Sequence, residues 1–83
     1  MASMSLHYWA GARAAAGVAH EEFEAGSIAD ALELACSSRG QEFRRVVSAC
    51  SLLVDGLAVH PDDIARPRTG SLRVELLPPF AGG

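Results

Sequence analysis

The sequence contains no lysine, because all seven of its basic residues are arginine. Without an ε-amine, no side chain of this protein can accept an isopeptide bond. The formal net charge is −3 and the sequence pI is about 5.4. Arg44 and Arg45 form a pair rather than a basic stripe, so we expect no nucleic-acid partner.

Cysteine and long apolar segments are also scarce. Cys36 and Cys50 are too few for a four-cysteine zinc or iron–sulfur site, and they do not form a Cys-x-x-Cys pair. We interpret both as small buried hydrophobes rather than as a redox pair, and we expect no bound metal and no bound cofactor. No apolar run approaches the roughly 20 residues that span a bilayer, and no amino-terminal stretch has the pattern of an export signal. The prediction is a cytoplasmic protein without a membrane partner.

The residues that are present suffice for one small domain. The 83 residues are 49% hydrophobic and 20% charged, which favours a folded core but leaves no room for a deep active-site cavity. We expect a single domain over residues 1–77, followed by an extended functional tail over residues 78–83. Catalysis by this chain alone is not expected.

Alternating residues predict a strand over residues 4–9. Met4, Leu6 and Tyr8 share the face that should be buried. Other elements expected in this half are a helix over 10–16 that ends at Gly17, a strand over 18–24 with Phe23 toward the core, and a turn at Ala25-Gly26.

The strongest helix signal covers residues 28–39. Ser27 is a natural N-cap, Asp30 stands three residues later, and Gly40 follows where a left-handed residue is expected. One face of this helix is apolar and should pack onto a sheet. Its members are Ile28, Ala31, Leu32, Ala35 and Cys36.

The second half contains a hairpin and a final strand. Asp55-Gly56 is a strong hairpin signal between strands over 51–54 and 57–60, because both central positions of a type I′ turn need positive φ. Residues 41–49 favour a short helical turn with Arg44 and Arg45 in solvent. The last strand is expected over 71–77, with Leu72, Val74 and Leu76 inward and Arg73 and Glu75 outward. The order predicts an α+β fold of the β-grasp, ubiquitin-like type, with a mixed sheet of four to five strands crossed by one long helix.

The segment after this strand indicates function. Pro78 and Pro79 favour extended backbone, and six residues from Pro78 onward can reach roughly 20 Å. Gly82 and Gly83 lack a Cβ, so they can thread a tunnel too narrow for other residues. Leu77 points away from Leu76 on a strand, which favours an exposed apolar partner patch over core packing. The alternative is an ordinary frayed end.

The sequence resembles the ubiquitin-like sulfur carriers, specifically the small subunit of molybdopterin synthase. The resemblance covers nearly the whole chain, and its most specific part is Leu76-Leu77-Pro78-Pro79-Phe80-Ala81-Gly82-Gly83. Further matches are Tyr8-Trp9-Ala10, Arg13-Ala14-Ala15-Ala16-Gly17, Ser27-Ile28-Ala29-Asp30 and Val54-Asp55-Gly56. One departure is Thr69-Gly70-Ser71, where the family often has a Gly-Asp turn.

This resemblance implies a chemistry. An ATP-dependent adenylyltransferase related to ubiquitin-activating enzymes would adenylate Gly83, and a sulfur donor enzyme would convert the adenylate to a thiocarboxylate. The large subunit of molybdopterin synthase, in a heterotetramer, would then receive the sulfur for a pterin precursor of the molybdenum cofactor. Ala81 and Gly82 would give clearance, while Leu77, Pro79 and Phe80 would anchor the tail in the partner.

Three alternatives stay open. The chain is a sulfur carrier of another pathway, such as thiamin or cysteine synthesis; or a ubiquitin-like modifier that is conjugated to other proteins; or a binding module without tail chemistry. His7, His20 and His60 are expected on separate elements without ligand spacing, so no metal site is predicted from them.

Overall fold

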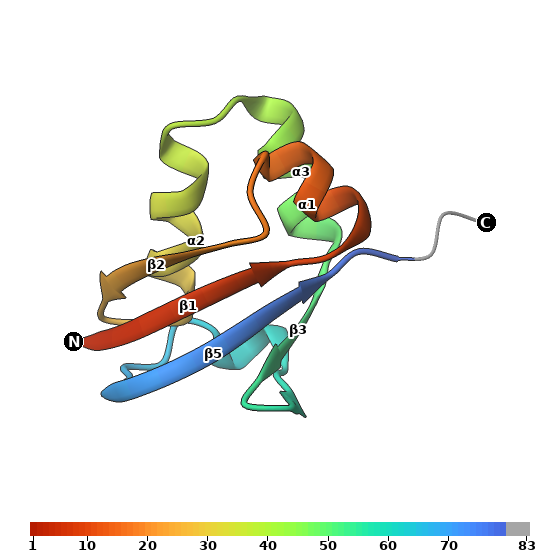
Figure 1. Cartoon of the computed structure of the whole chain (residues 1–83). Coiled ribbons are helices and arrows are strands. Elements are labelled where there is room, and N and C mark those ends of the chain that lie inside the picture. Colours follow the sequence, from red (N-terminus) through yellow and green to blue (C-terminus); the bar gives the residue numbers. More distant parts are fainter. Residues whose placement is uncertain (80–83) are drawn as a thin grey trace.

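Five strands form one mixed sheet, and helices cover one of its faces (Figure 1). The computed structural model describes residues 1–79. The strands are β1 Ala2–Tyr8, β2 His20–Ala25, β3 Ser51–Val54, β4 Leu57–Ala58 and β5 Gly70–Leu77. The helices are α1 Ala10–Ala16, α2 Ile28–Ser37, α3 Gln41–Ala49 and the 3₁₀ turn η1 Pro61–Asp63. The predicted α+β class and mixed sheet are confirmed.

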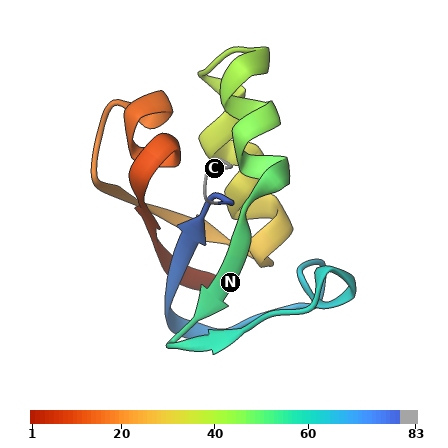
Figure 2. The same cartoon turned by 90° about the vertical axis from the view of Figure 1, so that its right-hand side faces the viewer.

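The strand order is β2-β1-β5-β3-β4, with β1 and β5 parallel at the centre and the other pairs antiparallel. Figure 2, seen from the end at which β5 finishes, shows β5 between β1 and β3. Because β1 and β5 run in the same direction, Trp9 emerges beside the end of β5. Its backbone N–H donates to the Leu76 carbonyl oxygen at 3.3 Å.

The core lies between the helices and the inward face of the sheet. Met4, Leu6 and Tyr8 are buried as the alternation predicts, and so are Val74 and Leu76. The helices contribute Ala12, Ile28, Ala31, Ala35, Cys36 and Phe43 to this buried cluster. The opposite face of the sheet, called here the open face, carries the alternate residues of each strand.

The β3–β4 hairpin has the predicted turn. Asp55 and Gly56 both have positive φ, at 49° and 86°. β4 ends at Ala58 and not at His60 as predicted. The reason is that His60 already caps η1, where its Nδ1 accepts from the Asp62 N–H at 3.1 Å.

The predicted limits of the first two strands were wrong by about two residues. β1 begins at Ala2, which is buried and lies in register with Ala25 and Gly70. β2 begins at His20 and includes Ala25, which the sequence placed in a turn. The residues added to the two strands, Ala2 and Ala25, are small, buried and paired with each other. Hydrophobic alternation alone does not predict that such residues belong to a strand.

The prediction of one long helix was also wrong. α2 ends at Ser37, and a second helix, α3, fills the segment predicted as a short turn. Gly40 has φ −87° and is the N-cap of α3, not a left-handed terminator of α2. A side chain takes over that role, because Arg39 Nη1 donates to the Ala35 carbonyl oxygen at 2.8 Å.

Arg39 also links the helices to the sheet through hydrogen bonds and an ion pair. Its Nη1 lies 2.7 Å from Glu21 Oε1 on β2, and Glu21 accepts from the Tyr8 hydroxyl at 2.6 Å. Its Nε donates to the Ala16 carbonyl oxygen at 3.2 Å, and its guanidinium lies 4.8 Å from the Phe43 ring centre. One side chain therefore joins the ends of α1 and α2 to α3, β1 and β2.

This network predicts a pH-dependent stability. Burial raises the pKa of Glu21, but the hydrogen bonds from Arg39 and Tyr8 outweigh it, so the pKa is lowered overall. A lowered folded-state pKa stabilises the fold above the unfolded value of about 4.3, and this stabilisation is lost as pH falls through the folded value. We predict that Glu21→Gln reduces the free energy of unfolding by about 1–2 kcal/mol at neutral pH, and that the difference shrinks toward pH ~3.

Urea denaturation at several pH values measures this difference. Glu42→Gln is the matched control, because the Glu42–Arg45 pair is exposed and should contribute little. A Glu21→Gln deficit that stays constant down to pH ~3 contradicts the assignment.

Candidate functional site

The end of β5 leads directly out of the sheet (Figure 1). Leu76 is fully buried, whereas Leu77 lies on the open face, is half-buried and does not belong to the apolar side chains packed on the core. Pro78 is half-buried and Pro79 is exposed. Four predicted site residues, Phe80, Ala81, Gly82 and Gly83, lie outside the described residues.

Trp9 lies beside this exit and was not singled out from the sequence. Its side chain is 44% exposed, and its indole Nε1–H donates to Glu75 Oε1 on β5 at 3.2 Å. The next residue, Ala10, has φ 47°, a conformation that L-residues rarely adopt. This sharp turn takes the chain from β1 into α1. The signal for Trp9 was available, because alternation after Met4, Leu6 and Tyr8 assigns it to the open face.

A row of side chains crosses the open face next to this exit. His20, His7, Glu75 and Leu53 stand in register on β2, β1, β5 and β3. The His7 and His20 rings are stacked, with centroids 5.2 Å apart. The sequence placed these histidines on separate elements, and the sheet brings them together.

The histidine pair does not form a metal centre in the described structure. Within residues 1–79, no group of three or more His, Cys, Asp or Glu side chains could hold a metal ion. Burial lowers the pKa of His7, and the charges of Arg73 and His20 lower it further. The neutral form of His7 is therefore favoured.

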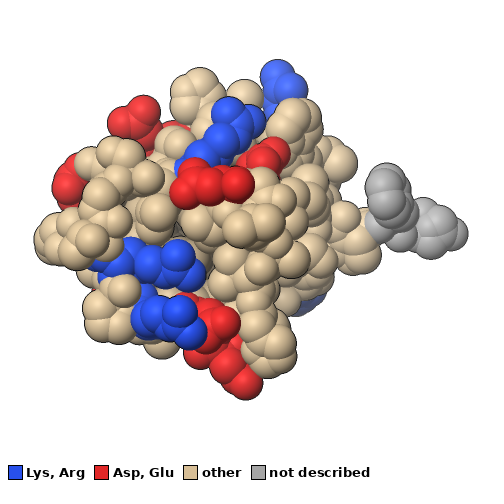
Figure 3. All heavy atoms as spheres, turned by 90° about the horizontal axis from the view of Figure 1, so that it is seen from below, with Lys and Arg blue, Asp and Glu red and all other residues tan. Residues whose placement is uncertain are grey.

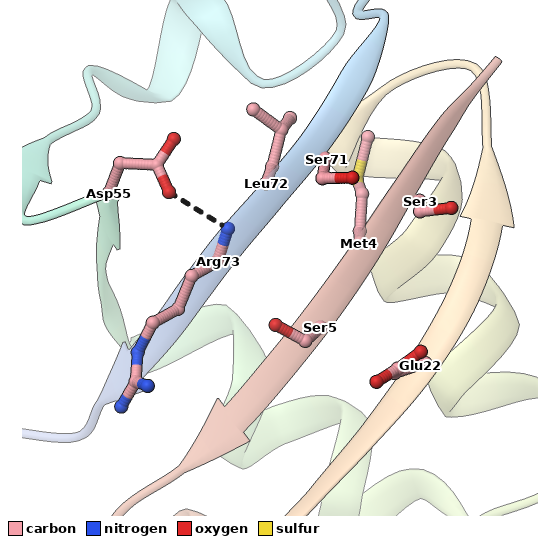
Figure 4. Close-up of a pocket in the computed structure, with 8 residues that line it drawn as sticks. All are labelled: Ser3, Met4, Ser5, Glu22, Asp55, Ser71, Leu72 and Arg73. Carbon is pink, nitrogen blue, oxygen red and sulfur yellow. Dashed lines mark hydrogen bonds between the residues drawn. The ribbon is translucent and has the colours of Figure 1, made fainter.

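A shallow hollow of about 330 Å³ lies farther along the open face (Figure 4). Its lining consists of Ser3, Met4, Ser5, Glu22, Asp55, Ser71, Leu72 and Arg73. Ser5 Oγ lies 3.2 Å from His7 Nε2, the contact that a nucleophile and its base would make. A catalytic base of this kind also needs a group that orients its second ring nitrogen. No described side chain forms a hydrogen bond with Nδ1 of His7. The Asp55 carboxylate instead accepts from the Arg73 backbone N–H at 3.1 Å.

The two cysteines are free thiols. Cys36 is buried in the core as predicted, whereas Cys50 is half-buried and its Sγ lies 3.3 Å from the Val46 carbonyl oxygen. Burial raises the pKa of both thiols, which disfavours the nucleophilic thiolate.

Charged side chains are mixed rather than gathered on the side shown in Figure 3. Arginine and acidic residues lie side by side in small groups there, and uncharged surface separates these groups. None of the helices in the described part of the chain has the length and apolarity needed to cross a membrane.

No protein-family model matches this chain, and no curated protein matches it in sequence. Solved structures do match. The small archaeal modifier protein 1 of Methanosarcina acetivorans is 19% identical with a TM-score of 0.83, and the match covers 100% of this chain and 98% of that one.

Two further solved structures are molybdopterin converting factors. The putative subunit 1 from Pyrococcus furiosus is 23% identical with a TM-score of 0.75, over 96% of this chain and 100% of that one. Subunit 1 of Helicobacter pylori, solved in complex with subunit 2, contributes a match at 12% identity and a TM-score of 0.68, over 98% and 99% of the two chains. At these identities the matches establish the fold, which is the ubiquitin-like β-grasp.

Substitutions of Leu76 and Leu77 test which of these two side chains at the end of β5 belongs to the core. Leu76→Ala removes a fully buried side chain and should lower the free energy of unfolding by about 2–5 kcal/mol. Leu77→Ala removes a half-buried side chain outside the core cluster and should cost about 1 kcal/mol or less. Chemical denaturation of both variants measures the difference, and equal losses would show that Leu77 is a core residue.

Proposed function

We propose that this protein is a ubiquitin-like sulfur carrier that acts as the small subunit of molybdopterin synthase. The observation that carries the proposal is the exit of β5. A strand anchored by Val74 and Leu76 in the core continues through Pro78-Pro79 into Phe-Ala-Gly-Gly. The shared fold of the two molybdopterin converting factor subunits supports it.

The chemistry takes place at the Gly83 carboxylate. A carboxylate oxygen attacks the α-phosphate of ATP in the adenylyltransferase, and pyrophosphate leaves. The resulting acyl adenylate has AMP as a good leaving group, and a persulfide sulfur of the donor enzyme displaces it to form an acyl disulfide. A second thiolate then cleaves the sulfur–sulfur bond, becomes part of a disulfide, and releases the thiocarboxylate. This chain supplies the reach and the carboxylate, and its partners supply the catalytic groups.

The sulfur acceptor is bound by the large subunit. The structure of the H. pylori factor is a complex of subunits 1 and 2, which supports a large partner for this chain. The dithiolene of the product needs two sulfurs, so two loaded carriers are used for each product, in a heterotetramer. Leu77, Pro79 and Phe80 anchor the tail in that subunit, and Ala81 and Gly82 give clearance around Gly83.

A second candidate is a protein modifier. The likeness to the small archaeal modifier protein 1 favours it, and the same activated Gly83 would then be attacked by a lysine amine of another protein. Because this chain has no lysine, it would act as a donor and would not extend through its own side chains. Sulfur transfer to thiamin or cysteine precursors is a third outcome, distinguished by the acceptor.

Intact mass spectrometry tests the leading proposal. After incubation with ATP, a sulfide source and the cognate adenylyltransferase, we expect the mass gain of one oxygen-to-sulfur exchange on the carboxyl-terminal peptide. Deletion of Gly83 should abolish this gain, and Gly82→Trp should reduce it at least tenfold because the bulky side chain blocks the tunnel. Both variants should keep the wild-type melting temperature, since the core cluster of the described residues is built from positions between Ala2 and Leu76.

Gly11→Ala is the matched glycine control, because a Cβ there meets nothing within 4 Å. No mass gain in the wild type, with an enzyme shown to be active on another carrier, contradicts the sulfur-carrier proposal. High-molecular-weight conjugates in cell extracts that disappear on deletion of Gly83 would favour the modifier.

A further inference from the structure

We infer that the outer edge of β2 binds an extended basic segment of another protein, which adds to the five-stranded sheet as a further strand. The site consists of the outward backbone groups and the side chains of His20, Glu22 and Glu24, called here the β2 edge. This inference goes beyond the proposed sulfur chemistry and does not depend on it, because it concerns a different strand from the one that leads into the tail.

The ladder between β1 and β2 shows which backbone groups of β2 face outward. β2 is an outer strand of the sheet and pairs with β1 in antiparallel register (Figure 4). The Tyr8 N–H donates to the Ala19 carbonyl oxygen at 2.9 Å, so these residues form a hydrogen-bonded pair. Such pairs recur at every second residue of an antiparallel ladder. The odd-numbered residues of β2 therefore bond to β1, and the N–H and C=O groups of the even-numbered residues, those of the β2 edge, point away from it.

These outward groups are available to a partner. Among the hydrogen bonds formed within residues 1–79, none joins the backbone of the β2 edge to a segment on its outer side. All three residues of the edge are exposed. A row of unpaired N–H and C=O groups is a template for another strand, and an extended peptide that adds to such an edge gains its affinity from main-chain hydrogen bonds. The opposite outer strand, β4, has only two residues and offers a shorter template.

Charge on the same residues determines the kind of segment that fits. Each of the four other glutamates lies within 3.9 Å of an arginine nitrogen; these are Glu21, Glu33, Glu42 and Glu75. Glu22 and Glu24 have no such cationic neighbour in the described part of the chain, and Glu24 accepts only from the uncharged Ser3 hydroxyl. Two uncompensated carboxylates thus stand two residues apart along the free edge, on the open face of the sheet. Basic side chains complement them.

The alternation of β2 specifies the order of residues in the added strand. Residues directly opposite each other on neighbouring strands point to the same face of the sheet. The two basic residues that face Glu22 and Glu24 are therefore separated by one residue, which lies on the helical side next to Phe23. Because Phe23 is half-buried and packs against the core, an apolar residue fits at that middle position. The bound segment consequently has the pattern basic, apolar, basic.

A second copy of this chain does not fit the same edge. If two β2 strands paired with their open faces on the same side, Glu22 and Glu24 of one copy would lie beside those of the other. Like charges on facing residues of neighbouring strands are destabilising. The glutamates therefore protect the edge against self-association, as charged residues on outer strands commonly do, and at the same time favour a basic partner.

Titration of the full-length protein with blocked heptapeptides tests the site. The probe alternates valine and arginine and carries three arginines. In one control peptide glutamate replaces each arginine, and in the other the arginine backbone nitrogens are methylated, which removes the ladder donors but keeps the charges. We expect the arginine peptide to bind at least tenfold more tightly than either control, because strand addition needs both the backbone donors and the positive charges.

Amide hydrogen exchange, measured by NMR, locates the bound peptide. The N–H groups of Glu22 and Glu24 should exchange at least about tenfold more slowly at saturating peptide, because they become hydrogen-bonded. The N–H of Phe23 already bonds to β1 and should change less.

A double variant isolates the charges of the edge. Glu22→Gln combined with Glu24→Gln keeps the hydrogen-bond acceptors and should weaken binding about tenfold or more at low salt, with a smaller difference at high salt. The matched control combines Glu42→Gln with Asp62→Asn, which removes two exposed charges far from β2 in the sequence. Its affinity should stay within about twofold of the wild type.

Tight binding of the arginine peptide with protection of the Glu22 and Glu24 amides supports strand addition at the β2 edge. The inference is overturned by absence of binding, by equal binding of the methylated peptide, or by unchanged affinity of the double glutamine variant. Protection of the same amides that grows with protein concentration in the absence of peptide would show a contact between two copies and would also overturn it. Sulfur loading of Gly83 is measured separately, so either proposal can fail without the other.

Discussion

The parallel pairing of β1 and β5 is the constraint on which the rest of the structure depends. Parallel neighbours cannot be joined by a tight turn, because the chain must return to the starting edge before the second strand begins. The segment from Trp9 to Thr69 connects the end of β1 to the start of β5. It contains the helices and the outer strands β2, β3 and β4. The same pairing places the carboxyl ends of β1 and β5 at the same end of the sheet. Trp9, which follows β1, therefore contacts the last residues of β5.

The contacts of Arg39 stabilise the segment between β1 and β5 where the helices pack on the sheet. A domain of this size buries a limited apolar area, and three short helices must pack over the same sheet face. Arg39 provides donors to two backbone carbonyls and a carboxylate, and its flat guanidinium covers the Phe43 ring. Because Glu21 and Tyr8 are strand residues, the positions of the helices are coupled to the ladder between β1 and β2.

Sequence reasoning succeeded where a local pattern decides the structure. The burial of Met4, Leu6 and Tyr8 follows from alternation, the Ser27 cap from local hydrogen bonding, and the Asp55-Gly56 turn from positive φ. It failed where distant residues decide. Gly40 was not needed as a helix terminator because Arg39 satisfies the Ala35 carbonyl, and the pairing of His7 with His20 depends on strand register. Alternation alone assigns Trp9 to the open face, but its hydrogen bond to Glu75, 66 residues away, depends on strand register.

Under the proposed function, the tail and the side chains beside the end of β5 have different tasks in selecting partners. Glycine and alanine offer a partner little beyond backbone groups, so Gly82-Gly83 fits any suitably narrow tunnel and discriminates poorly among proteins that possess one. Sulfur transfer and protein conjugation both begin with activation of the same carboxylate. The difference between these fates must then come from side chains that distinguish one partner from another. Side chains beside the end of β5 are of this kind: the indole of Trp9, which Glu75 holds, and Leu53 and Leu77, which lie outside the core cluster. Under the proposed function, the fit of these side chains to a partner, rather than the Gly-Gly sequence, decides which reaction the activated chain enters.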